Sequence, residues 1–470
     1  MPHLNDVDET FVATLHDLLP DAAFRDIAGY IEEPRGSWSG KAGVVVAPGS
    51  TAEVSAVMQA ANAARVAVIP YGGGTGLVGG QILQDGPLPL ILSMERMTRI
   101  RHIDAFENVL IAEAGTIVEQ LHQAAEAIDR LFPLSFAAQG SARIGGSLGT
   151  NAGGLNVLRY GNTRDLCLGL EVVMADGRVM NTLKRLRKDN TGYDLRNLMI
   201  GSEGTLGVIT AAALKLFPRP AARATALMVV PSPQAALELL AKTRDHAGES
   251  ISAFELISGM GLQFLAKELP DIRRPFDPAP DWMVLTELGL ATGGQPEAML
   301  EAIFEEAFEA GLVSDGIIAQ NATQAAELWT VRETIPEANR LTGAISSHDI
   351  SVPITSLPAF IEEGRQILAG MGPYRLNCFG HLGDGNMHYN VFPPEGHSKA
   401  EYAAHKAPVM EAIHDLVAAY GGSISAEHGI GRLKAADLAR YGDPVKLELM
   451  RGIKDLFDPN GILNPGAVLL

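Results

Sequence analysis

Apolar residues in the first part of the chain follow two patterns that predict different elements. Their helical spacing over residues 9–19, and again over 24–31, predicts two short helices. From Gly43 onward, short apolar runs separated by glycine, proline and polar residues predict strands. These runs span residues 44–48, 66–70, 90–94, 108–115, 166–179 and 207–217. Between the first two runs, Ser50 predicts a helix through Ala64, because a serine hydroxyl can accept from the first free amides of a helix.

A proline-rich stretch, PRPAARAT, interrupts this pattern and predicts a domain boundary at Pro218. Beyond it, longer helical patterns alternate with single strands. The predicted helices span residues 232–246, 295–310, 323–338, 357–369 and 399–419, and the predicted strands span 282–287, 348–352, 374–379 and 423–426. This order indicates an α+β domain with a predominantly antiparallel sheet flanked by helices.

The composition is that of a globular protein and narrows the range of partners. The chain has 470 residues, 47% hydrophobic and 20% charged, which suits about two to three domains with sizeable cores. A formal net charge of −18 argues against nucleic acid or an anionic membrane surface as the main partner. Cys167 and Cys378 form no CxxC pair, and neither a secretory signal nor an apolar run of about 20 residues is visible. We therefore expect a soluble, cytoplasmic protein without an integral membrane segment.

The first chemical signal is the segment PYGGGTGLVGG at residues 70–80, directly after a predicted strand. Glycine-rich turns let backbone N–H groups approach phosphate oxygens, because no Cβ stands in the way. Gly74, Gly76 and Gly79 formally match the Rossmann pattern GxGxxG, with Glu95 downstream for a ribose contact. That fingerprint requires a helix opening at the glycines, whereas LVGGQILQDGPLPL follows here. The segment favours a different kind of diphosphate site, with a purely structural turn as the alternative.

Two further segments share this composition. Residues 141–165 and 201–210 are rich in glycine, small hydroxyl side chains and asparagine, and each lies against a predicted strand. A structural turn is a reasonable explanation for one such segment but a poor one for three. A single extended cofactor lying between them explains all three, and a dinucleotide with adenine, pyrophosphate and isoalloxazine has the required length.

The second chemical signal lies near the C-terminal end. His381 and His388 are seven residues apart in GHLGDGNMHYN, a spacing that suits a strand–turn–strand, and Glu427 and His428 follow in SISAEHGIGR. Imidazole and carboxylate are the usual ligands of zinc and similar ions, and three protein ligands leave a position for substrate. These segments predict a metal site with an acid–base residue beside it. Turn histidines bonded to backbone carbonyls are the alternative.

Several motifs together resemble those of one family. These motifs are PYGGGTGLVGG, IGGSLGTNAGG, RYGNTRDLCLGLEVVMADG, LRKDNTGYDLRNLMIGSEGTLGVIT, GHLGDGNMHYN, AEHGIGR and DPNGILNPG. They resemble the FAD-linked oxidase family of the vanillyl-alcohol oxidase superfamily, with the D-2-hydroxyglutarate and D-lactate dehydrogenases as the closest branch. The resemblance covers about residues 38–466. It implies an N-terminal helical segment (1–38), a two-lobed FAD-binding domain of the vanillyl-alcohol oxidase type (39–218), a cap domain with the substrate and metal site (219–455), and a C-terminal segment returning to the flavin (456–470).

The resemblance also implies noncovalent FAD, because members with covalent flavin often carry a histidine in the first glycine segment and this chain does not. Three groups of residues match the family's cofactor contacts. Those at the pyrophosphate are Pro70, Gly72, Gly73, Gly74, Thr75, Gly76 and Leu77. Those along the ribityl chain and flavin ring are Gly140, Ser141, Gly145, Gly146, Thr150, Asn151, Gly153 and Gly154. Those at the adenine half and the returning C-terminus are Glu203, Gly204, Gly207, Ile209 and Asn464.

In the cap, the resemblance assigns a divalent metal site and a substrate-side pair. His381, His388 and Glu427 match the metal ligands, for zinc or alternatively manganese or iron. Asn390 and His428 match residues on the substrate side.

Arg332, in VRETI, matches the arginine that binds the substrate carboxylate. Its planar guanidinium offers two parallel donors, which lysine does not. The alternative is a surface helix arginine paired with Glu333 or Glu337.

These assignments imply oxidation of a D-2-hydroxy acid, of the D-2-hydroxyglutarate or D-lactate type, to the 2-oxo acid. A divalent ion chelated by the hydroxyl and carboxylate lowers the pKa of the hydroxyl. His428 is the expected base, because histidine changes charge near neutral pH, and flavin N5 takes the hydride from C2. His348 is the next candidate base, since its strand is expected to face the same pocket.

Other functions are compatible with parts of this pattern. An acceptor protein or a quinone is the expected electron partner, whereas a glycolate-type oxidase would use oxygen. A metal-dependent hydrolase would leave the glycine segments unexplained, and a noncatalytic flavin-binding or substrate-sensing protein would not turn over. A homodimer is one candidate assembly.

Three positions depart from relatives in the family. Many have a lysine where this chain has Ser347, and some 2-hydroxyglutarate enzymes have a threonine where it has Pro336. Both positions help to hold carboxylate groups in those relatives, so recognition of a distal carboxylate is less secure here. Ala467 replaces a common lysine, and no effect is argued for it.

Overall fold

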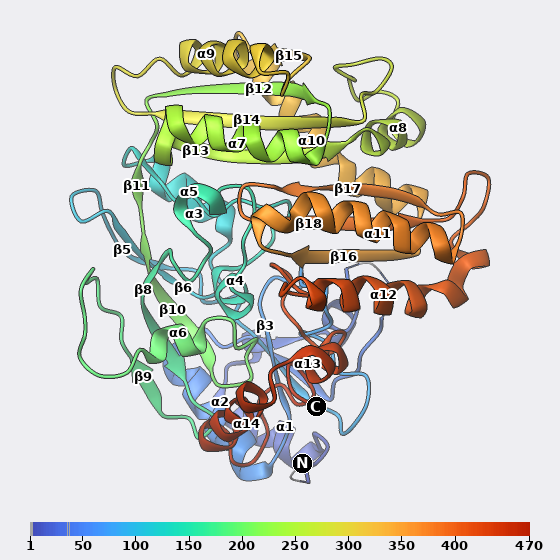
Figure 1. Ribbon diagram of the computed structural model, residues 1–470. Coiled ribbons are helices and arrows are strands. Elements are labelled where there is room, and N and C mark those ends of the chain that lie inside the picture. Colours follow the sequence, from blue (N-terminus) through green and yellow to red (C-terminus); the bar gives the residue numbers. More distant parts are fainter. Residues whose placement is uncertain (1–2, 35, 37) are drawn as a thin grey trace. The chain divides into compact units, whose positions relative to one another are not determined.

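The computed structural model describes residues 3–34, 36 and 38–470, so residues 1–2, 35 and 37 of the predicted N-terminal segment lie outside the description. The chain divides into two compact units (Figure 1). The first unit comprises Met1–Gly154, Tyr160–Pro218 and Glu427–Leu470, and the second comprises Leu155–Arg159 and Arg219–Ala426.

The first unit begins with a small, mostly parallel sheet of strand order β1-β2-β4-β3. Its elements are α1 (Glu9–Leu18), β1 (Phe24–Arg25), β2 (Val44–Val46), α2 (Thr51–Ala64), β3 (Val68–Tyr71) and β4 (Leu90–Ser93). The Ser50 hydroxyl accepts from the amide of Glu53, which confirms the predicted N-cap of α2. Residues 24–31, predicted as a helix, form only β1 and a short 3-10 turn.

A larger antiparallel sheet of order β5-β6-β10-β8-β9 completes the first unit's sheets, beside the short pair β11-β7. The elements are β5 (Ile100–Asp104), β6 (Val109–Glu113), α3 (Val118–Glu126), β7 (Arg130–Leu131), α4 (Ile144–Thr150), β8 (Cys167–Val173), β9 (Val179–Asn181), α6 (Leu195–Met199), β10 (Val208–Lys215) and β11 (Phe217–Pro218). The short helix α5 (Val157–Tyr160) falls mostly in the second unit. One hydrophobic core joins the buried faces of α1, α2, β6, β8 and β10.

The C-terminal segment returns to this unit at Glu427, earlier than the sequence-based boundary at 456. It carries α13 (Ala435–Tyr441) and α14 (Pro444–Phe457). Phe457 packs against the core of the first unit, and Leu463 is fully buried within it. Helical spacing predicts an apolar face but does not say which core that face joins, which explains the difference.

The second unit is built on one antiparallel sheet of order β15-β12-β14-β13-β17-β18-β16. Its strands are β12 (Ala222–Val230), β13 (Ile251–Ser258), β14 (Trp282–Leu290), β15 (Asp315–Ile318), β16 (Ser346–Ser351), β17 (Arg375–His381) and β18 (Asn386–Phe392). Its helices are α7 (Pro233–Ala247), α8 (Gly259–Glu268), α9 (Pro296–Glu309), α10 (Ala322–Thr342), α11 (Leu357–Met371) and α12 (Lys406–Ala419). Short 3-10 turns in the chain are Asp21–Ala23, Ile27–Tyr30, Gly248–Ser250, Ile354–Ser356 and Ala400–His405.

The two faces of this sheet are covered by different helices (Figure 1). Helices α7, α9, α11 and α12 lie on one face, and α8 and α10 lie on the other, where they pack against each other. The predicted antiparallel sheet with flanking helices is confirmed. Pairing of the predicted strands at β16, β17 and β18 places their alternate residues on the α10 face. Residues 423–426, predicted as a strand, contribute only a bridge between Ser423 and Ser351.

Among the described residues, no helix is both long and apolar enough to cross a membrane.

Candidate functional site

The first glycine segment begins at Pro70 within β3, leaves the strand after Tyr71 and continues through residues 72–77 without regular structure. Gly74 has φ +71°, and a Cβ on Gly73 would lie 2.3 Å from the carbonyl oxygen of Ser141. Within the part of the chain that the structure describes, the amides of residues 72–77 donate no hydrogen bond to another protein group. A row of such donors on a glycine turn suits the oxygens of a diphosphate. The prediction that no helix opens at these glycines is confirmed.

The second glycine segment, expected to be a loop, folds near its start into the short helix α4. Its C-cap Asn151 has φ +53°, and its side-chain oxygen accepts from the amide of Arg164 at 2.9 Å. This segment approaches the first one closely: a Cβ on Gly72 would lie only 3.2 Å from Gly146 Cα. The two segments therefore meet backbone to backbone.

The third glycine segment is fixed by the carboxylate of Glu203. Its two oxygens accept from the amides of Ile430 and Gly431 at 2.7 and 2.8 Å. Burial raises the pKa of Glu203, although both amides favour the ionised form. This carboxylate ties the segment to the returning C-terminal chain, a role that the resemblance did not suggest.

Asn464 and Arg432 complete this attachment. The Asn464 side chain donates to the carbonyls of Gly80 and Glu203 at 3.0 and 2.7 Å, and accepts from Arg432 at 2.7 Å. Arg432 also donates to the carbonyls of Gly79 and Gly80, both at 3.0 Å. Burial lowers the pKa of Arg432 to about 10. The side chains of Asn464 and Arg432 therefore hold the end of the first glycine segment in place.

The other residues assigned to the cofactor fall into two classes. Gly207 precedes β10, and Ile209 lies within it and is buried in the core of the first unit. The remaining ones lie along the three glycine segments or, for Gly140, directly before the second one: Thr75, Gly76, Leu77, Gly140, Gly145, Thr150, Gly153, Gly154 and Gly204. Their contacts with a cofactor stay predictions.

In the second unit, strand register brings the predicted cap residues to one face of the sheet. His381 and His388 lie on the neighbouring strands β17 and β18, and Asp349 on β16 is the register partner of His388. Asn390 follows two positions after His388, opposite Ser347. Because alternate residues of a strand share a face, these side chains project toward the helix α10 side.

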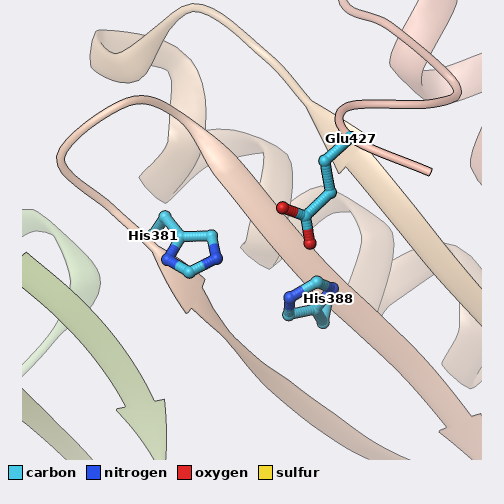
Figure 2. Close-up of side chains that lie close together, drawn as sticks. All are labelled: His381, His388 and Glu427. Atoms are coloured by element: carbon cyan, nitrogen blue, oxygen red, sulfur yellow. The ribbon is translucent and has the colours of Figure 1, made fainter. Parts of the chain in front are cut away.

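The predicted metal ligands come together. Ligand atoms of His381, His388 and Glu427 all lie within 4.8 Å of one another, and Figure 2 shows the two imidazoles and the carboxylate turned toward a common point. Glu427 directly follows the last residue of the second unit. A second such group comprises Asp349, Glu427 and His428. The donor set, imidazole and carboxylate, fits zinc, manganese or iron.

His381 is oriented by Glu255, which is not among the predicted site residues. The Nδ1 of His381 lies 2.7 Å from Glu255 Oε1, and since a carboxylate only accepts, Nδ1 carries the proton. This leaves Nε2 of His381 as its ligand atom. Metal-binding histidines commonly donate their other N–H to a carboxylate in this way.

Arg332 pairs with the same Glu255 rather than with Glu333 or Glu337. Its Nε and Nη2 lie 2.9 and 2.7 Å from Glu255 Oε2, and its guanidinium lies 4.8 Å from the ring of Phe379. Glu337 instead pairs with Arg340. Burial by itself would raise the pKa of Glu255, but the charges and hydrogen bonds of His381 and Arg332 lower it to about 2.

Asn390 and His428 border the predicted ligands. The Asn390 side chain is buried, and its amide donates to the carbonyl of His388 at 3.2 Å. His428 is partly exposed, with Nε2 3.7 Å from a Glu427 oxygen. His428 therefore lies beside a predicted ligand, as expected.

The expectation for His348 is wrong. Alternation along β16 turns this side chain to the opposite face from Asp349, where it bonds Ser346 Oγ at 2.9 Å and packs on His414 of α12 at a ring distance of 5.2 Å. Its strand borders the site, but its side chain points away from it.

One feature of the sequence indicates that Glu255 is a site residue. It is a lone carboxylate in the otherwise uncharged strand ISAFELIS, all of which is buried. A charge in such a run requires buried partners, so it marks a site even when the partners are unknown. Residues 251–258 are not among the predicted strands, although they form β13.

Comparison with known proteins identifies the family. The profile of the FAD linked oxidases, C-terminal domain, matches residues 219–468, and that of the FAD binding domain matches residues 42–183. The chain belongs to the FAD-linked oxidase family. The predicted family is therefore confirmed, and so is an FAD-binding domain in the first unit.

Curated relatives cover nearly the whole chain. A D-2-hydroxyglutarate dehydrogenase of Xanthomonas citri pv. viticola is 39% identical over 445 residues, which is 94% of this chain and 92% of the relative. A mitochondrial D-2-hydroxyglutarate dehydrogenase of Danio rerio is 39% identical over 92% of this chain and 79% of its own length. The Arabidopsis thaliana counterpart is 35% identical over 100% of this chain and 83% of its own length.

Solved structures share the fold at low identity. p-Cresol methylhydroxylase with substrate bound superposes with a TM-score of 0.76 at 16% identity, over 100% of this chain and 98% of that one. 4-Ethylphenol oxidase from Gulosibacter chungangensis gives 0.73 at 18% identity, over 99% and 98%. The predicted vanillyl-alcohol oxidase fold is confirmed.

Proposed function

We propose that this chain is an FAD- and divalent-metal-dependent dehydrogenase that oxidises a D-2-hydroxy acid to the 2-oxo acid. The observation that carries the proposal is the convergence of His381, His388 and Glu427 within 4.8 Å in a chain of the FAD-linked oxidase family. The relatives named D-2-hydroxyglutarate dehydrogenase support the substrate class.

The glycine segments of the first unit fit FAD. Residues 72–77 offer amide donors for the pyrophosphate, and the close approach of Gly72 to Gly146 brings the flavin-side segment next to them. Bound FAD would supply the acceptor for the hydride that leaves C2 of the substrate. A hydrolase reading leaves these segments without a role.

The cap residues fit a divalent metal. Two imidazoles and one carboxylate form the donor set, and Glu255 holds His381 in the tautomer whose Nε2 carries no proton. A metal on these ligands would lower the pKa of the substrate hydroxyl that it binds. Zinc is the proposed ion, with manganese or iron as alternatives.

Binding of the acid and removal of its proton fall to Arg332, Asn390 and His428. The Nη1–Nη2 edge of Arg332 is not used by Glu255 and suits a carboxylate, and Asn390 lies on the same sheet face as the ligand His388. His428 lies next to the ligand Glu427 and accepts the hydroxyl proton.

The remaining partners stay predictions. We propose an acceptor protein or a quinone as the electron partner, and a cytoplasmic location for the chain. The plant and fish relatives carry mitochondrial names, so fractionation of the source cells is the test of location. Light scattering with inline chromatography tests the candidate homodimer.

The deciding experiment is anaerobic reduction of the purified protein by a panel of D- and L-2-hydroxy acids, with a metal assay on the same sample. We expect a yellow protein with stoichiometric metal, bleached by D-acids and not by L-acids. Acid precipitation should release the colour into the supernatant, as noncovalent FAD requires. Rapid recovery of the colour in air would identify the oxygen-using oxidase instead, and an unbleached flavin would indicate a noncatalytic flavoprotein.

A further inference from the structure

Glu255 is a buried charge whose effect on Arg332 the proposed function leaves open. It is 1% exposed, at the centre of strand β13, and the neighbouring positions of that strand are all buried. Desolvation of a carboxylate in such a place is strongly unfavourable unless its partners offset it. The identity of those partners therefore indicates why it is there.

Both oxygens of Glu255 are committed, each to a different residue. Oε1 accepts from His381 Nδ1 at 2.7 Å, and Oε2 accepts from Arg332 Nε and Nη2 at 2.9 and 2.7 Å. These partners come from the neighbouring strand β17 and from helix α10, which covers this face of the sheet. All three residues belong to the second unit.

Each contact fixes a property of its partner. A carboxylate has no proton to donate, so His381 must keep its proton on Nδ1, and its Nε2 then carries the lone pair that a metal would bind. On Arg332 the Nε–Nη2 edge is occupied, so an anion can use only the Nη1–Nη2 edge. One carboxylate thus sets the tautomer of a metal ligand and the presented edge of an anion-binding group.

We propose that Glu255 is a positioning residue shared by the metal site and the substrate-carboxylate site, so that loss of one carboxylate weakens both. The proposal rests on the proposed function above. A purely structural ion pair holding α10 on the sheet would need Arg332 but would give His381 no part. If the ion pair is purely structural, loss of the carboxylate should lower thermal stability and leave metal affinity unchanged. If Glu255 positions both partners, the loss should mainly lower metal and anion affinity.

The test is Glu255→Gln, measured by competition of Zn²⁺ between the protein and a chromophoric chelator, and by calorimetry with oxalate as the anion. An amide offers one acceptor oxygen, so it cannot serve both partners, and an N–H facing Nδ1 would move the histidine proton to Nε2. We expect Zn²⁺ affinity to fall roughly 10–100-fold. Oxalate affinity at saturating Zn²⁺ should fall by about tenfold, as for one charge-assisted hydrogen bond.

Two further variants separate positioning from folding. Glu287→Gln is the matched control, because Glu287 lies on the adjacent strand β14 and accepts from Trp329 of α10, one turn before Arg332. It should leave both affinities within about twofold of wild type, the scatter of a remote site. Glu255→Asp keeps the charge and both oxygens, so it preserves the tautomer and should keep Zn²⁺ affinity within about tenfold even if Glu255→Gln does not fold.

The outcomes distinguish this proposal from the proposed function. If wild type holds stoichiometric metal and oxidises the acid, but Glu255→Gln binds Zn²⁺ and oxalate as Glu287→Gln does, only the positioning role is overturned. Glu255→Asp keeps the carboxylate that holds the proton of His381 on Nδ1. If Glu255→Gln does not fold and Glu255→Asp loses Zn²⁺ as completely as a ligand variant, the positioning role is also overturned. If wild type binds no stoichiometric metal, the proposed function falls and this inference with it.

Discussion

The glycine segments of the first unit and the sheet face of the second offer different groups to a ligand: backbone amides in the first and side chains in the second. In the first unit, the groups that can bind a ligand are the backbone amides of residues 72–77. The polar side chains of Glu203, Arg432 and Asn464 instead form hydrogen bonds with other groups of the protein. In the second, the backbone is committed to the sheet ladder, and the chemistry lies in side chains such as His381 and His388.

This difference predicts two kinds of sensitivity. A backbone site is broken by added volume, because a single methyl group obstructs the approach of two chains. A side-chain site tolerates volume better but is broken by loss of one functional group. The four changes below test this contrast, from the largest expected effect to the smallest.

His388→Ala should abolish turnover and metal binding while the flavin stays bound. Removing one of three ligands should exceed the roughly 10–100-fold loss of affinity that supporting partners cause. Metal content and the flavin spectrum of the purified variant are the measurements. His397→Ala, at an exposed histidine paired with Glu401, is the control and should match wild type. Full activity after exhaustive chelation of the wild type would rule out a catalytic metal.

His428→Ala should keep metal and flavin but slow flavin reduction by roughly 10²–10⁴-fold, the usual contribution of a positioned base. The loss should be partly recovered as pH rises, because hydroxide in solvent can then take the proton without help. Stopped-flow reduction as a function of pH measures both effects.

The control for this base is Arg332→Lys, which keeps the charge and loses the planar fork. It should raise KM more than it changes the pH dependence. Flavin reduction at the wild-type rate in His428→Ala would show that the base lies elsewhere, and His348 does not face the site.

Gly73→Ala should weaken FAD binding by roughly 10–100-fold, since its Cβ would lie 2.3 Å from the Ser141 carbonyl oxygen and overpacking of this kind costs about 1–3 kcal/mol. Fluorescence titration of the deflavinated protein gives the affinity. Gly149→Ala is the matched control, because a Cβ there meets nothing within 4 Å and the residue lies within helix α4. Equal FAD affinity for the two variants would show that backbone approach is not limiting.

Ser347→Lys should raise kcat/KM for D-2-hydroxyglutarate relative to D-lactate by about tenfold, the effect of one charge-assisted hydrogen bond. Ser347 is exposed and lies opposite Asn390 in the sheet register, so a cation there can reach a distal carboxylate. Steady-state kinetics with both acids measure the ratio. Ser347→Met supplies similar length without charge, and an equal change in the two variants would remove the electrostatic explanation.

Local sequence determined much of this protein. The glycines of PYGGGTGLVGG cannot open a helix when proline and glycine continue after them, so the non-Rossmann character was readable, and residues 72–77 have no helix. Ser50 began a helix for a local reason, and the spacing of His381 and His388 across a glycine turn brought both onto paired strands. These features depend on neighbours within a few residues, which the sequence displays directly.

Tertiary structure decided what depends on distant partners. Glu255 lies 126 positions from His381 and 77 from Arg332 along the chain, so no local pattern could join them. The side that His348 faces followed from the register of β16, since one residue of shift exchanges the two faces of a strand. The allocation of α14 to the first unit followed from which core its apolar face met. Composition and spacing determine which functional groups the chain carries. The tertiary fold brings distant segments together and so determines which of these groups contact the same carboxylate.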